Sequence, residues 1–177
     1  MKKPISAMSM QELGGFLCDA LKAKGIHVVL SGGSCVQIYS RGEYTSHDLD
    51  LINQYNEQFK KIQMTMEELG FKEHNRYFVH DDTPLFIEFP CGPLGVGDAP
   101  VEEIAHIDTE AGVLRLLTPT DCIKDRLAAY YHWDDEQCLQ QAVWVAQKNT
   151  FDMASVKKWS LKEGMKDKFL IFEKKVP

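Results

Sequence analysis

Two acidic residues separated by one leucine place the strongest constraint on how this chain can fold. The segment Asp48-Leu49-Asp50-Leu51 alternates acidic and apolar residues. Residues two apart in a β-strand project to the same face, so both leucines would enter the core while both carboxylates share the opposite face. Neighbouring carboxylates repel each other unless a cation or a proton lies between them. We therefore expect a strand over residues 45–52 whose acidic face binds Mg²⁺ or Mn²⁺. The alternative is an exposed strand edge or a turn without a metal.

A glycine pair precedes this acidic strand by about 15 residues. The β-branched run over residues 26–30 continues into Ser31-Gly32-Gly33-Ser34, which predicts a buried strand, a glycine turn and then a short helix over residues 35–40. Backbone N–H groups at such a turn, together with the Ser34 hydroxyl, can hold a phosphate. Glycine pairs are common in tight turns, but a turn of this kind followed by an acidic strand favours nucleotide and metal binding.

The remaining pattern predicts an α+β fold with a mixed β-sheet flanked by helices. A helix over residues 10–24 would begin with a capping box formed by Ser9 and Glu12 and would end at Gly25. Thr118 and Pro119 are typical of a helix start and open a helical C-terminal third, with a break near residues 132–134. Other expected elements are a helix over residues 55–69, strands over 76–80, 84–89 and 113–117, and a loop over 91–100. We expect residues 1–177 to form one domain.

Composition excludes several classes of protein. The net charge of −6 argues against a protein coated for nonspecific nucleic-acid binding, and no apolar run reaches the length of a membrane span. The five cysteines are scattered and odd in number, which predicts neither a disulfide framework nor a zinc site and favours a cytoplasmic location. Residues 157–175 hold seven lysines against three acidic residues; this segment is either a solvated amphipathic helix or a contact surface for RNA or polyphosphate.

The glycine turn and the acidic strand together resemble the signature of the nucleotidyltransferase superfamily. The segments Ser31-Gly32-Gly33-Ser34 and Asp48-Leu49-Asp50-Leu51 are similar to those of DNA polymerase beta-like minimal nucleotidyltransferases, especially the abortive-infection type of toxin nucleotidyltransferase. The resemblance covers roughly residues 26–145. It implies Mg²⁺- or Mn²⁺-dependent transfer of a nucleoside monophosphate from an NTP, such as ATP, to a hydroxyl on RNA (for example tRNA), a protein or a small molecule. It also implies a cognate antitoxin protein as a possible partner.

The resemblance requires a third carboxylate on a later strand. Glu88, within the apolar run over residues 85–89, is the natural candidate, because an acid among apolar strand residues needs a partner or a function. A salt bridge or a half-exposed strand is the alternative explanation, and Asp81 or Asp82 is the second choice. By resemblance, Asp48, Asp50 and Glu88 would be the catalytic and metal-binding residues.

The same resemblance implies a nucleotide-binding set. Its expected members are Gly32, Gly33, Ser34, Lys124 and Arg126. The residues after the glycine turn, 35–37, supply no basic side chain, although the toxin group commonly has one there. This departure favours the alternative function, a non-catalytic nucleotide-binding or toxin–antitoxin regulatory module with the same fold.

Overall fold

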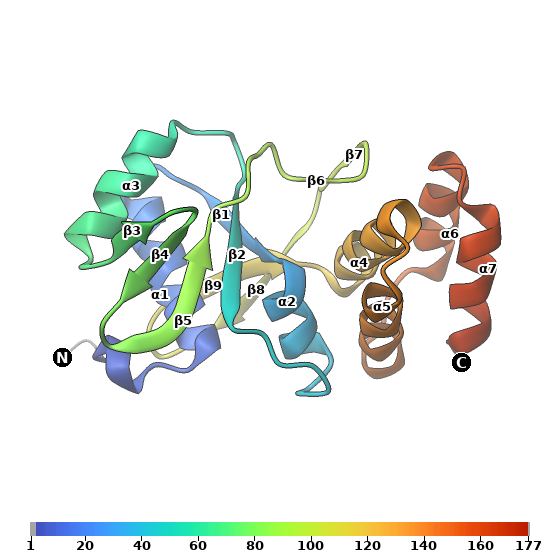
Figure 1. The fold of residues 1–177 in the computed structure, drawn as a ribbon, viewed down its shortest axis with the longest axis horizontal. Helices are drawn as coiled ribbons and strands as arrows, with labels where there is room; N and C mark the ends of the chain where they lie inside the picture. The colour runs from blue at the N-terminus through green and yellow to red at the C-terminus, as the bar shows by residue number, and fades with distance from the viewer. Residues whose placement is uncertain (1–2, 177) are drawn as a thin grey trace.

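A seven-stranded mixed sheet organises the first two thirds of the chain in the computed structural model, which describes residues 3–176 (Figure 1). The strand order is β3-β4-β5-β2-β1-β9-β8. The elements up to the middle of the chain are η1 (Ile5–Ala7), α1 (Met10–Ala23), β1 (Val28–Ser31), α2 (Gly32–Tyr39), β2 (Asp48–Asn53), α3 (Phe59–Glu68), β3 (Lys72–His74), β4 (Tyr77–His80) and β5 (Thr83–Glu88). The later ones are β6 (Gly95–Val96), β7 (Ala99–Pro100), β8 (Ile104–Asp108), β9 (Val113–Leu117), α4 (Pro119–Trp133), α5 (Glu136–Lys148), α6 (Met153–Lys162) and α7 (Lys166–Lys175).

The register of the three central strands fixes which side chains meet. Strand β2 runs antiparallel to β1, which pairs Asp50 with Ser31, and parallel to β5, which pairs Asp50 with Glu88. Because side chains of directly paired residues lie on the same face of a sheet, the acidic face of β2 is also the face of Glu88.

The opposite face of the sheet builds the core. Leu30, Leu49, Leu51 and Ile87 are fully buried there. Helix α1 covers this face: a Cβ atom on its Gly14 would lie 3.2 Å from a methyl of Leu49. The alternation of buried leucines and acidic residues in β2 thus confirms the expected period of two.

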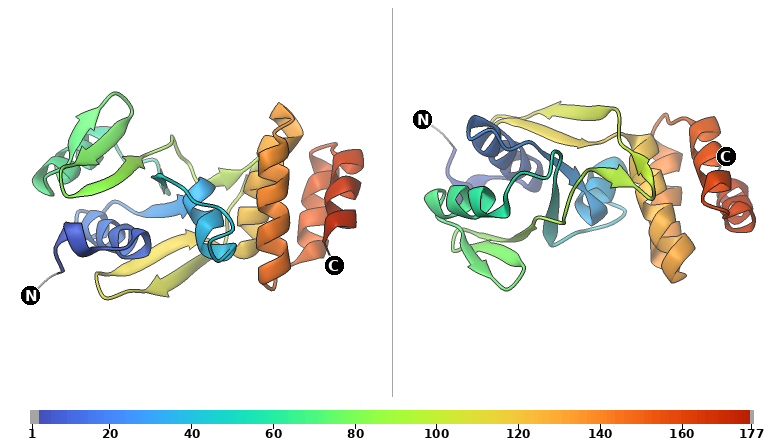
Figure 2. Two further views of the ribbon diagram at one scale, coloured as in Figure 1. Left: turned by 60° about the horizontal axis from the view of Figure 1, so that its bottom comes forward. Right: turned by 90° about the horizontal axis from the view of Figure 1, so that it is seen from above.

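Four helices form the C-terminal part, and α4 and α5 lie between the sheet and the α6–α7 pair (Figure 2). The Thr118 hydroxyl accepts from the Asp121 N–H and Pro119 occupies the first turn of α4, as expected. Asp134 ends α4 in the left-handed conformation (φ 54°), and Asp135 caps α5. The expected α+β architecture, the helical C-terminal third and the break near residues 132–134 are confirmed.

Several local expectations were wrong. Helix α2 begins at Gly32, so the glycine pair forms its first turn rather than a separate turn before a helix. Strands β3 and β8 were not expected, and the region expected as a loop contains the short β6–β7 pair. Strand β2 starts at Asp48 and α3 at Phe59, each three or more residues later than expected.

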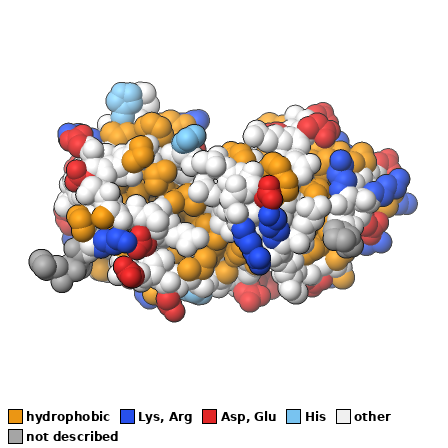
Figure 3. All heavy atoms as spheres, turned by 90° about the horizontal axis from the view of Figure 1, so that it is seen from below, with side chains coloured by type: hydrophobic (Ala, Val, Ile, Leu, Met, Phe, Trp, Pro, Cys, Tyr) orange, Lys and Arg blue, Asp and Glu red, His pale blue; other side chains and the backbone are white. Residues whose placement is uncertain are grey.

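The lysine-rich segment folds as two helices, α6 and α7, separated at Gly164, which has φ 74°. Its charges are partly paired: Lys168 Nζ donates to the carbonyl of Tyr131 at 2.7 Å and pairs with Asp134, while Lys157 lies 3.6 Å from Glu173. Figure 3 shows Lys and Arg side chains beside Asp and Glu side chains over the end where these helices lie. On that face the segment is therefore a solvated surface of mixed positive and negative charge.

Among the described residues, no helix is both long and apolar enough to cross a membrane.

Candidate active site

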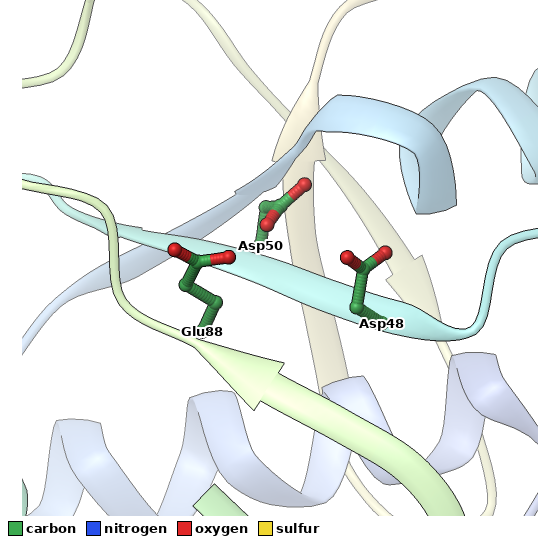
Figure 4. Close-up of side chains that lie close together, drawn as sticks. All are labelled: Asp48, Asp50 and Glu88. Atoms are coloured by element: carbon green, nitrogen blue, oxygen red, sulfur yellow. The ribbon is translucent and has the colours of Figure 1, made fainter. Parts of the chain in front are cut away.

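Three carboxylates converge on the face of the sheet opposite α1 (Figure 4). Asp48 and Asp50 come from β2 and Glu88 from the end of β5, and each offers an oxygen within 4.8 Å of the others. The two-residue spacing places the aspartates on one face, while the parallel pairing of β2 with β5 brings Glu88 directly opposite Asp50. The structure thus brings together the three residues that the sequence nominated as a metal site.

The carboxyl group of Asp50 carries the electrostatic cost of this arrangement. Burial, followed by the neighbouring Asp48 and Glu88, raises its pKa from 3.8 to about 7, although the Arg126 guanidinium opposes the rise. A buried carboxylate is costly to keep ionised without a cation. The cluster is therefore strained electrostatically in the metal-free protein and is suited to a cation.

We expect Asp50→Asn to stabilise the metal-free protein at pH 8 and not at pH 4. The folded-state pKa is raised, so ionisation of Asp50 penalises folding as pH rises from about 4 to about 7. The shift corresponds to an upper bound of about 4 kcal/mol, which partial access to solvent reduces to about 1–3 kcal/mol. Denaturant unfolding in the presence of a chelator measures it, and equal stability of the two proteins at pH 8 would contradict the strained cluster.

Asp48 is held in place by its neighbours. The Ser46 hydroxyl donates to Asp48 Oδ1 at 2.7 Å, and the Ser46 N–H donates to Gln37 Oε1 at 2.7 Å. Ser46 is itself buried. The loop between α2 and β2 therefore fixes the direction of the Asp48 carboxylate.

Glu88 has a cationic neighbour that the sequence did not reveal. Arg76 Nε lies 3.5 Å from Glu88 Oε1, and its side chain is 69% exposed while that of Glu88 is 21% exposed. The salt bridge that was the alternative explanation for Glu88 is therefore present. Its distance is long, however, and the Arg76 side chain lies mostly in solvent. It leaves the carboxylate facing Asp50.

The glycine pair shapes the site by close packing. Gly32 has φ 63°, and a Cβ atom there would lie 2.0 Å from Asp50 Oδ2. A Cβ atom on Gly33 would lie 3.0 Å from Ser46 Oγ. The buried Ser34 hydroxyl donates to the Asp48 carbonyl, so it ties α2 to β2. These residues bring the first turn of α2, whose leading N–H groups lack helical partners, against the aspartates.

Gly32→Ala should destabilise the protein more than Gly42→Ala. Both glycines have positive φ, but a Cβ atom at Gly42 (φ 88°) would meet nothing within 4 Å. The backbone strain common to both should cost about 1–2 kcal/mol, and overlap with Asp50 should add about 1–3 kcal/mol at Gly32. Denaturant unfolding of both variants measures the difference, and equal losses would mean that Gly32 does not pack against Asp50 as described.

The two expected basic residues of α4 lie in different places. Lys124 Nζ pairs with Asp121 at 3.1 Å and lines a pocket of about 510 Å³ whose lining includes none of the three carboxylates. Arg126 is mostly buried and pairs with Asp125, and its charge acts on Asp50. Burial works against the charge of Arg126, but Asp125 and its surroundings raise its pKa, so the guanidinium stays charged. The structure therefore brings Arg126 near the carboxylates and places Lys124 elsewhere.

Comparisons with known proteins bear on the fold. No family model matches the sequence, and no curated protein does so either. A crystal structure of ANT(2'')-Ia in complex with adenylyl-2''-tobramycin matches with a TM-score of 0.51 at 14% identity, over 86% of this chain and 94% of that one. A solution structure of the antibiotic-resistance factor ANT(2'')-Ia matches with a TM-score of 0.48 at 15% identity, over 87% of each chain. The likeness to the crystal structure confirms the nucleotidyltransferase-like fold that the sequence predicts.

Proposed function

We propose that this protein is a metal-dependent nucleotidyltransferase that moves a nucleoside monophosphate from an NTP to an acceptor hydroxyl. The observation that carries the proposal is the convergence of Asp48, Asp50 and Glu88 on one face of a sheet with this fold. The solved complex of a protein with the same fold contains an adenylylated product, which supports the general chemistry.

The residues fit a hard divalent cation. All three side chains offer carboxylate oxygens, which Mg²⁺ and Mn²⁺ prefer, and burial, followed by the charges of Asp48 and Glu88, raises the pKa of Asp50. When bound, Mg²⁺ would neutralise charge on the triphosphate and on the departing pyrophosphate. Asp48 and Asp50 would hold it, with Ser46 keeping Asp48 aligned.

Each protein group has a defined task in the transfer. The first turn of α2 would direct N–H groups toward the triphosphate, and Arg126 would add a positive charge that acts on Asp50. The acceptor oxygen would form a bond to the α-phosphorus as the bond from that phosphorus to the bridging oxygen breaks. Pyrophosphate leaves with the electron pair, and the Glu88 carboxylate takes the hydroxyl proton.

The test is incubation of the purified protein with each α-labelled NTP and Mg²⁺ or Mn²⁺, in the presence of total RNA, protein extract or tobramycin. We expect label on one acceptor class, release of pyrophosphate, and no transfer when a chelator is present. NTP binding without transfer to any acceptor would replace this proposal with the non-catalytic nucleotide-binding module. The antitoxin partner stays a prediction from the sequence.

A further inference from the structure

An aromatic pocket lies beside the carboxylates on the same face of the sheet. Its volume is about 300 Å³. Asp48 belongs to both the pocket and the carboxylate cluster, so the two are continuous. The residues that line the pocket are Tyr44, Thr45, Ser46, His47, Asp48, Tyr77 and Phe86.

The strand register places the pocket's aromatic floor. Phe86 is paired with Asp48 across β5 and β2, and Tyr77 is paired with Glu88 across β4 and β5. Directly paired residues share a face, so both rings stand on the face that carries the carboxylates. Phe86 is 44% exposed, whereas its neighbour Ile87 is fully buried on the other face. Packing in the hydrophobic core therefore does not explain why a phenylalanine occupies position 86.

The two rings and the Arg76 guanidinium lie side by side on this face. The Tyr77 and Phe86 ring centroids lie 5.7 Å apart with their planes tilted by 47°, and the Arg76 guanidinium carbon lies over the Tyr77 ring, 4.8 Å from its centroid. Arg76 is largely exposed and also approaches Glu88. A planar group on the rings would thus have a cation beside it and the Glu88 carboxylate within the same site.

This surface lies on the β5 and β4 side of the carboxylates. Strand β1 flanks β2 on one side, while β5 and then β4 flank it on the other. Helix α2 directly continues β1, and its first residue, Gly32, packs against Asp50. If the triphosphate lies against α2, in-line displacement requires the acceptor hydroxyl to approach the α-phosphorus from the opposite side. That side carries Glu88, Phe86 and Tyr77.

We propose that the acceptor is a single-stranded polynucleotide whose terminal base stacks on Phe86, beside Tyr77, and whose phosphate meets Arg76, with its terminal hydroxyl at Glu88. This inference rests on the proposed function and names the acceptor class for the same site. Aromatic rings bind bases of any sequence through their π-faces, and an exposed arginine is suited to phosphate.

The test uses a short RNA oligonucleotide with a free 3′ hydroxyl and a matched oligonucleotide whose last nucleotide lacks its base. We expect the wild type to bind and extend the intact RNA, with KM and Kd for the abasic RNA higher by roughly 5- to 100-fold. Phe86→Leu should weaken binding of the intact RNA by a similar factor and leave binding of the abasic RNA unchanged. Phe86→Tyr, which keeps a ring, should restore wild-type binding.

Phe59→Leu is the matched control, because Phe59 is 47% exposed but lies on α3, outside the pocket. It should bind both oligonucleotides as the wild type does. Equal binding of intact and abasic RNA, or equal losses in the Phe86→Leu and Phe59→Leu proteins, would overturn the stacking site. Transfer to tobramycin or to protein without transfer to RNA would also overturn it while leaving the proposed function intact. Absence of transfer to any acceptor would instead count against the proposed function itself.

Discussion

Asp50→Asn is expected to yield a folded protein whose nucleotide transfer rate is at least about 10³-fold below that of the wild type. Asp50 lies between Asp48 on its own strand and Glu88 on the neighbouring one, so its charge is central to any cation held there. The amide keeps the shape of the side chain and removes that charge. Initial rates with labelled NTP, and calorimetric titration with Mg²⁺, should show loss of both transfer and metal binding.

The stability of this variant makes the result unambiguous. Because the same substitution removes a buried charge, the metal-free variant should unfold at a higher denaturant concentration than the wild type at pH 8. A loss of transfer then cannot come from misfolding. Asp81→Asn is the matched control, since the Asp81 side chain is 88% exposed and pairs with Lys72 away from the cluster. Equal Mg²⁺ affinity in the wild type and the Asp50→Asn variant would remove Asp50 from the metal site.

The local part of the site could be predicted because it depends on short-range periodicity. Alternation along β2 is enough to place Asp48 and Asp50 on one face and Leu49 and Leu51 in the core. The helix start at Thr118 follows equally from local chemistry, since the hydroxyl cap and the following proline act within one turn. No knowledge of distant partners is needed for either feature.

The position of the third carboxylate could not be predicted in the same way, because it depends on the register of the sheet. The sequence offered Glu88, Asp81 and Asp82 as third carboxylates, and the parallel pairing of β5 with β2 places Glu88 opposite Asp50. That pairing joins strands separated by α3, β3 and β4, so periodicity within one segment does not reveal it. Arg76, which approaches Glu88 from the turn between β3 and β4, was missed for the same reason.

Two other differences have local physical causes. Glycine has a low helix propensity, so Gly32 and Gly33 indicated a turn. In the structure, α2 begins at these glycines, because the space beside Asp50 and Ser46 admits no side chain. Lys124 and Arg126 are two residues apart on a helix, about 200° around its axis. Lys124 and Arg126 therefore cannot both face the carboxylates. The helical period alone is enough to show that only one of them can contact a nucleotide bound there.

Glu88→Gln is expected to spare NTP binding and to slow transfer by roughly 10²–10⁴-fold, the usual range for a lost general base. Asp48 and Asp50 remain to hold the cation, whereas the amide cannot accept the proton of the acceptor hydroxyl. The exposed Arg76 should lose its partner without disturbing the fold, because the Nε to Oε1 distance is already 3.5 Å. Nucleotide affinity by calorimetry and single-turnover transfer rates separate these two effects.

Comparison with Asp50→Asn then decides what Glu88 contributes. If Glu88 acts on the acceptor, its variant keeps Mg²⁺–NTP affinity and loses rate, while the Asp50 variant loses both. If Glu88 serves mainly as a third metal ligand, the two variants will lose affinity together. A wild-type transfer rate in the Glu88→Gln protein would exclude both roles, and the proton of the acceptor would then have to leave through another group, with Asp48 on the same face as the next candidate.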